Sequence, residues 1–247
     1  MRRRRIIFSL IGCLISLLAI SLASAGENTD SPNPSLTQKQ CDELVSRLVS
    51  TAKPPFSKDY VLDDDESLKK IDTKAQARVK QAYDKLSDIF AAALPALVRH
   101  ASDGQFSYVY EDVGTSEVVV RADVGGACCR IIEAHIEVYR DRLVRYDFAE
   151  IPRCPSFIAK CGGVEKWWKT RKHKDVTVLQ LEAIEWALTI AKTRGFQTRP
   201  QGDAETNKFE SEKAKKDAIK ALQSMADGIR NTGKPIVVEH HIQFFGK

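Results

Sequence analysis

The fold class is decided by one stretch of the sequence, DVTVLQLEAIEWALTIAKTR at residues 175–194. Asp175 suits the position just before a helix, where a carboxylate accepts hydrogen bonds from backbone N–H groups that have no partner inside the helix. One apolar stripe at helical spacing is formed by Leu181, Ile184, Leu188 and Ala191. The stripe is broadened by Leu179, Trp186 and Ile190. So wide a face predicts a core helix that contacts several neighbours.

Most of the remaining chain also has the apolar periodicity of helices. The predicted helices lie at residues 37–50, 72–100, 123–139, 164–172 and 206–231. Thr37 and Asp123 are the expected N-caps of two of them. Pro95 falls inside the longest stretch, where it either kinks the helix or begins a new one in its first turn.

Extended structure is expected in only two places. Residues 106–110 and 118–121 are rich in aromatic and β-branched side chains around the turn sequence Asp112-Val113-Gly114, which predicts a short hairpin and no larger sheet. Residues 236–245 alternate apolar and polar side chains, which predicts a strand or extended segment. The expected fold class is therefore mainly α: a compact, irregular helical domain with a short hairpin insertion and a C-terminal helix followed by an extended segment.

The N-terminus has the pattern of a signal peptide over residues 1–25. Four arginines at positions 2–5 precede an apolar run that ends in Ala23-Ser24-Ala25, the small-residue pattern that signal peptidases cleave. Cleavage near Ala25-Gly26 predicts a protein exported to the periplasm or the extracellular space. An uncleaved anchor over residues 6–26 and a lipidated Cys13 are the alternatives, and the lipidated form would leave a short apolar core.

The composition of the rest of the chain predicts a leader, a main domain, a linker and a C-terminal part. Residues 26–35 contain Asn, Asp, Ser and two prolines, which is typical of a flexible leader. A helical globular domain is expected over residues 36–196 and a polar linker over residues 197–205. The C-terminal helix and extended segment, residues 206–247, are expected to pack on the main domain.

The net charge argues against nucleic acid as a partner. The whole chain carries a formal charge of +5, but residues 1–25 contain four arginines and no acid, which leaves 34 basic and 33 acidic residues after cleavage. Such a chain lacks the positive field that draws proteins to phosphate backbones. Membrane contact is expected only through the signal peptide before cleavage.

Five cysteines remain after the expected cleavage, and an exported protein can oxidise them. Cys154 and Cys161 flank a short proline-containing loop and are the predicted disulfide. Zinc binding by these two cysteines with His173 is less favourable, because their spacing is too long for a zinc knuckle and no fourth ligand is evident. Cys128 and Cys129 are adjacent and unsuited to bonding each other.

No catalytic or cofactor motif stands out. Cys128 and His135 lie two turns apart on one helix face, too far for a nucleophile–base pair, and are expected in the core. His240-His241 would point to opposite faces of an extended segment. Glu182 and Glu185 share one helix turn and give no sign of converging on a cleft. No catalytic residue, metal site or cofactor is therefore predicted.

The best candidate for a binding site is the aromatic and basic segment at residues 164–172. Trp168 is expected to pack against the helix at residues 175–194. Trp167, turned about 100° away on the same helix, is then expected to face outward. Its predicted surroundings are the cations Lys166, Lys169 and Arg171. An exposed tryptophan among cations is typical of a protein-binding surface.

Two family resemblances accompany these patterns. Residues 94–98 (LPALV), Asp103, Val124 and residues 127–132 (ACCRII) together resemble one helical pair of a HEAT repeat, over about residues 94–136. Trp167-Trp168 followed by residues 179–186 (LQLEAIEW) resembles a family of exported bacterial proteins. The resemblances imply a HEAT-like helical scaffold and export, and no activity.

Together these features predict an exported, non-enzymatic helical protein that mediates protein–protein interaction in the cell envelope. The alternatives are a cell-envelope hydrolase whose site has no recognisable motif, and a purely structural accessory protein.

Overall fold

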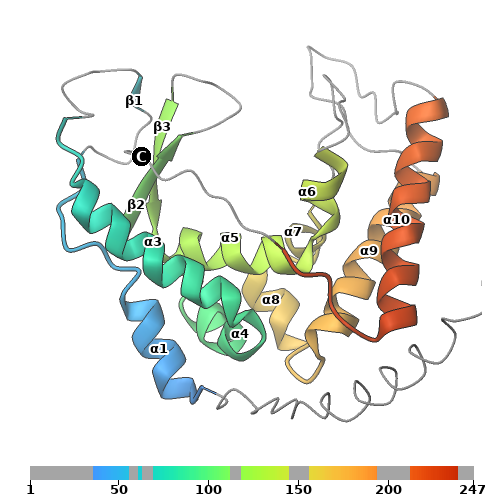
Figure 1. Ribbon diagram of the computed structural model, residues 1–247, viewed down its shortest axis with the longest axis horizontal. Helices are drawn as coiled ribbons and strands as arrows, with labels where there is room; N and C mark the ends of the chain where they lie inside the picture. The colour runs from blue at the N-terminus through green and yellow to red at the C-terminus, as the bar shows by residue number, and fades with distance from the viewer. Residues whose placement is uncertain are drawn as a thin grey trace, which may run out of the picture. The chain divides into compact units, whose positions relative to one another are not determined.

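Helices make up most of the computed structural model (Figure 1), which confirms the mainly α fold class. The structure describes residues 36–55, 61–62, 69–111, 118–144, 156–193 and 212–238. The helices are α1 (Gln38–Ser46), α3 (Thr73–Asp88), α4 (Phe90–Arg99), α5 (Val124–Ile136), α6 (Tyr139–Val144), α7 (Phe157–Lys160), α8 (Val164–Lys169), α9 (Val176–Thr193) and α10 (Glu212–Thr232). The predicted signal peptide, leader and linker lie outside the described residues.

Side-chain caps set where several helices begin. Thr37 accepts a hydrogen bond from the Gln40 N–H, and the Gln40 side chain accepts one from the Thr37 N–H, so the two residues form a capping box. The Asp72 carboxylate caps α3 by accepting from the N–H groups of Lys74 and Ala75, and the Asp123 carboxylate caps α5 by accepting from the Gly126 N–H. The expected N-caps Thr37 and Asp123 are thus confirmed.

The long helical stretch at residues 72–100 breaks at Ile89, six residues before the expected position. Ile89 leaves helical geometry (φ −104°, ψ 25°), ends α3 and begins α4. Pro95 lies inside α4, so it does not begin a new helix, and the predicted kink stays a prediction. α4 is short, and a proline at its sixth position removes one N–H donor from a helix that is otherwise held by buried apolar contacts.

The hairpin is confirmed, but it belongs to a small sheet. Strands β2 (Phe106–Glu111) and β3 (Val118–Asp123) pair antiparallel, and β1 (Val61–Leu62) pairs with the other edge of β3. Strand β1 was not predicted, because two residues are too few to show an alternating pattern. Helix α6 was not predicted either.

The helix that decided the fold class lies among several neighbours, as predicted. α9 packs against α5, α7 and α10, and α5 in turn contacts α3 and α4 (Figure 1). The buried face of α9 is formed by Leu179, Gln180, Ala183, Ile184, Ala187 and Ala191. One continuous apolar core therefore joins α1, α3 and α4 to α9 and α10 through α5.

The two helices of the HEAT-like pair, α4 and α5, form and pack together with β2 and β3 between them in sequence. Gly125 permits their close approach at the start of α5, because a β-carbon there would come within 2.6 Å of the Ala101 carbonyl oxygen. The resemblance to HEAT repeats itself stays a prediction. Among the described residues, no helix combines the length and apolar character needed to cross a membrane.

Candidate binding groove

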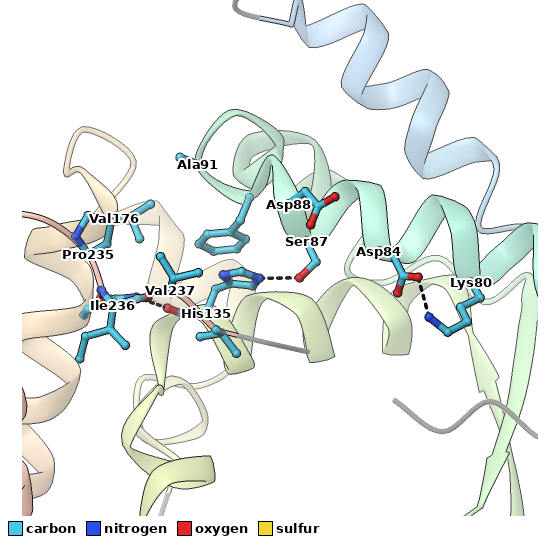
Figure 2. A pocket seen from close by; sticks show the side chains of 13 residues that line it. Lys80, Asp84, Ser87, Asp88, Ala91, His135, Val176, Pro235, Ile236 and Val237 are labelled. Carbon is cyan, nitrogen blue, oxygen red and sulfur yellow. Dashed lines mark hydrogen bonds and ion pairs between the residues drawn. The ribbon is translucent and has the colours of Figure 1, made fainter. Parts of the chain in front are cut away.

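A groove of about 600 Å³ opens where four sequence-distant parts of the chain meet (Figure 2). One wall is the C-terminal half of α3 with the start of α4, the floor includes α5, and the other wall is the start of α9 with the extended segment after α10. Its lining residues include Asp84, Ser87, Asp88, His135, Gln180 and Val237. The volume lies in the range of pockets that hold small ligands or side chains of a partner.

A buried polar pair lies at the floor of the groove. The Ser87 hydroxyl lies 2.7 Å from Nε2 of His135, and both residues are buried. The Phe90 ring stacks on the His135 imidazole with centroids 4.3 Å apart and planes 9° from parallel. The stack and the hydrogen bond fix the plane of the imidazole ring, so the floor is pre-shaped.

Two residues on either side of the break at Ile89 contact the same histidine. Ser87 lies in the last turn of α3, and Phe90 is the first residue of α4. Residues three apart lie on the same face of a regular helix. Both side chains reach His135 on α5, so they remain on one side of the chain across the break.

The α3 side of the groove is acidic. Asp84 forms an ion pair of 2.5 Å with Lys80, one turn earlier on the same helix. Asp88 is exposed at the end of α3 and makes no ion pair within the part of the chain that the structure describes. Lys80 therefore balances the charge of Asp84, whereas no described cation balances the charge of Asp88.

The opposite side is apolar and is held in place by Gln180. Its side-chain amide donates to the carbonyl oxygens of His135 (2.7 Å) and Ile236 (3.0 Å) and accepts from the Ile236 N–H (2.7 Å). Gln180 is almost fully buried. The residues around this contact in the groove wall are Val176, Pro235, Ile236, Val237 and Val238.

The predicted binding segment on α8 is arranged differently from the expectation. Trp167 is fully buried and Trp168 is half-buried, so the expected exposure of Trp167 is wrong. Val164 and Trp167, three positions apart, form the inward face of α8, which the sequence analysis had assigned to Trp168. The two tryptophans were interchanged because one short helix turn offers too few apolar residues to orient it.

The cations of that segment do not surround an exposed ring. Lys166 and Lys169 are exposed, but Arg171 is paired with Glu182 at 2.8 Å and lies over the Phe157 ring. Burial would raise the pKa of Glu182, yet hydrogen bonds and charge from Lys174 and Arg171 lower it below the usual value. Arg171 therefore ties α8 to α9 instead of forming part of a binding surface.

The cysteine predictions have mixed outcomes. Cys128 lies in the core as expected, and burial raises the pKa of its thiol to about 12. Cys161 is half-buried, while Cys154 lies outside the described residues, so their disulfide stays a prediction. His240-His241 also lie outside them. Within the described ranges, no group of three His, Cys, Asp or Glu side chains is placed to hold a metal ion.

The groove residues were missed, although two of them carry a signal. Gln180 and His135 are polar residues within buried helical stripes, and a polar group in a stripe must find a hydrogen-bond partner. His135 lies in the core as expected, whereas its partner Ser87 was not predicted. Comparison with known proteins adds no family to this picture: no protein-family model, curated protein or solved structure matches the chain.

Proposed function

We propose that this chain is an exported, non-enzymatic binding protein that holds a segment of another protein in the groove between α3 and residues 235–238. The observation that carries the proposal is the groove itself, with an acidic wall, an apolar wall and a fixed polar floor. Convergent polar groups in a largely apolar pocket are typical of binding sites. Export rests on the signal pattern at residues 1–25.

The groove, and not α8, is the better candidate for this interaction. Trp167 is buried and Arg171 is already paired, whereas the groove presents Asp88 and Val237 to solvent. Aromatic or charged groups contribute to an interface when a partner can reach and desolvate them. The α8 segment offers mainly exposed lysine side chains.

A blocking substitution tests the proposal. Ala91 is exposed at the groove, so Ala91→Trp fills it from outside the core, and Ala77→Trp, at an exposed position of α3 away from the groove, is the matched control. Peptides selected from a random display library on the wild-type protein should lose affinity about tenfold or more with Ala91→Trp, as expected when an interface is occluded. They should bind the Ala77→Trp variant normally. Selection of no peptide, or equal binding to both variants, contradicts the proposal.

The second candidate function is hydrolysis, favoured by the contact between Ser87 and His135. A hydroxyl within hydrogen-bond reach of an imidazole is the first requirement of a serine nucleophile. Against it, both side chains are less than a tenth exposed, and Ser87 lies within the last turn of a helix. A fluorophosphonate probe separates the two: labelling of Ser87 that is lost in Ser87→Ala supports hydrolysis, and binding without labelling supports the groove proposal.

A further inference from the structure

We infer that the partner segment binds as an added β-strand along residues 235–238, pairing with the main chain of Val237 and directing a basic side chain towards Asp84 and Asp88. This inference rests on the proposed function and specifies the partner as an extended, basic and apolar peptide. It combines two features of the groove: the main chain of Val237 on one wall and the carboxylates of Asp84 and Asp88 on the other.

The extended segment, residues 235–238, makes main-chain hydrogen bonds to the rest of the described structure through Ile236. Gln180 occupies both the N–H and the C=O of Ile236. In an extended chain, successive residues direct their N–H and C=O groups to opposite sides. The N–H and C=O of Val237 therefore point away from Gln180.

Val237 is open to a partner. It is 81 % exposed, and no hydrogen bond to its main chain is found among the described residues. An extended segment with unpaired N–H and C=O groups is a template for another strand. Because Gln180 holds the neighbouring residue, the template is fixed before the partner arrives, which lowers the entropic cost of binding.

The residues before Val237 limit where a strand can add. Gly233 ends α10 with a positive φ of 63°, which turns the chain into the extended segment. Pro235 has no N–H, and lysine and proline at positions 234 and 235 are residues that discourage pairing at strand edges. Within residues 235–238, main-chain pairing is thus centred on Val237, a short register that suits a peptide better than a sheet.

Charge selects the partner's side chains. Val237 lines the same groove as Asp84 and Asp88, which come from α3 on the other wall. Lys80 neutralises Asp84, so the wall keeps the charge of Asp88. A lysine or arginine on the added strand would meet this carboxylate, and apolar residues would meet Val176 and Val238.

The test uses an end-blocked peptide of about ten residues, a common strand length, in which valine and lysine alternate. Val237→Pro removes the single N–H that the inference requires, while Val237→Ala removes the same side chain and keeps the N–H. Loss of one main-chain hydrogen bond should weaken binding to Val237→Pro about tenfold relative to Val237→Ala. Thermal melting of both variants should match the wild type, because the Val237 N–H makes no bond to be lost within the described structure.

A second experiment changes the peptide and leaves the protein unchanged. The same peptide with its valine nitrogens methylated should lose binding to the wild type, and a valine–glutamate peptide should bind about tenfold or more weakly than the valine–lysine peptide. Asp88→Asn should reduce that difference. Equal binding of the methylated peptide, or no preference for lysine over glutamate, overturns the inference.

The outcome also separates this inference from the proposed function. Binding that Ala91→Trp blocks but Val237→Pro and N-methylation leave unchanged overturns strand addition and keeps the groove. Binding that none of these changes affects overturns both.

Discussion

At the scale of single residues, Gln180 contributes most to the shape of the groove. Its amide is buried in α9 and joins two segments that are remote in sequence, the end of α5 through the His135 carbonyl and the extended segment through Ile236. A buried amide with its donors and acceptor satisfied rigidifies its surroundings, whereas its loss leaves several buried groups unpaired.

Gln180→Met should therefore detach the extended segment. Methionine has similar length but makes none of the three hydrogen bonds. We expect a loss of about 2 to 4 kcal/mol in the free energy of unfolding. Faster hydrogen exchange should appear at the Ile236 amide, with Gln76→Met, another buried glutamine remote from the segment, as the comparison. Unchanged protection of Ile236 would show that Gln180 does not hold the segment.

The two tryptophans of α8 provide a second prediction. Trp167 is fully buried, and its indole N–H has no hydrogen-bond partner among the described residues. Trp167→Ala should cost about 3 to 5 kcal/mol of stability, as large core truncations do, and Trp168→Ala clearly less. Trp167→Phe should cost less than Trp167→Ala, because it keeps an aromatic ring and removes the unpaired donor. Chemical denaturation measures all three, and a larger loss from Trp168→Ala would contradict the assignment.

At the scale of secondary-structure elements, Glu137 joins the end of α5 to the start of α7. Its side chain is fully buried and accepts hydrogen bonds from the Ser156 hydroxyl (2.8 Å), the Ile158 N–H (2.7 Å) and the Arg140 guanidinium (3.0 Å). Burial raises the pKa of Glu137 above its usual value, although these three contacts act to lower it.

The raised pKa of Glu137 determines whether this residue makes the fold more or less stable as the pH rises. A carboxyl that binds its proton more tightly in the folded state stabilises the fold below its unfolded pKa of about 4.3. That contribution is lost as the pH rises through the higher folded pKa. Wild type should therefore lose stability relative to Glu137→Gln over the range in which the pH rises above about 4.3. A relative gain for wild type over this range, measured by urea denaturation, would mean that the hydrogen bonds outweigh burial.

The sequence predicted elements better than it predicted their breaks. Caps are local, so Thr37 and Asp123 could be recognised from a few neighbouring residues. The break at Ile89 has no such signal, because isoleucine is compatible with a helix. Pro95 is a strong local signal, yet the new helix begins at Phe90, five residues before it.

At the scale of the whole molecule, the groove depends on contacts that no local pattern encodes. Ser87 and His135 are 48 residues apart, His135 and Gln180 are 45 residues apart, and Ile236 is 56 residues beyond Gln180. The sequence indicated that α9 must have several neighbours, but not which neighbours or where the space between them remains open. The fold class was accessible from periodicity, whereas the site required the tertiary arrangement.

The central claim is that a partner segment occupies the groove, and a chemical-shift map of the complex tests it most directly. Backbone resonances of the labelled protein are recorded during titration with the valine–lysine peptide. The account predicts that the largest shifts fall at residues 87–91, at His135 and at residues 235–238, with little change at α8. Shifts concentrated on Lys166 and Lys169, or small shifts spread over the surface, would contradict it.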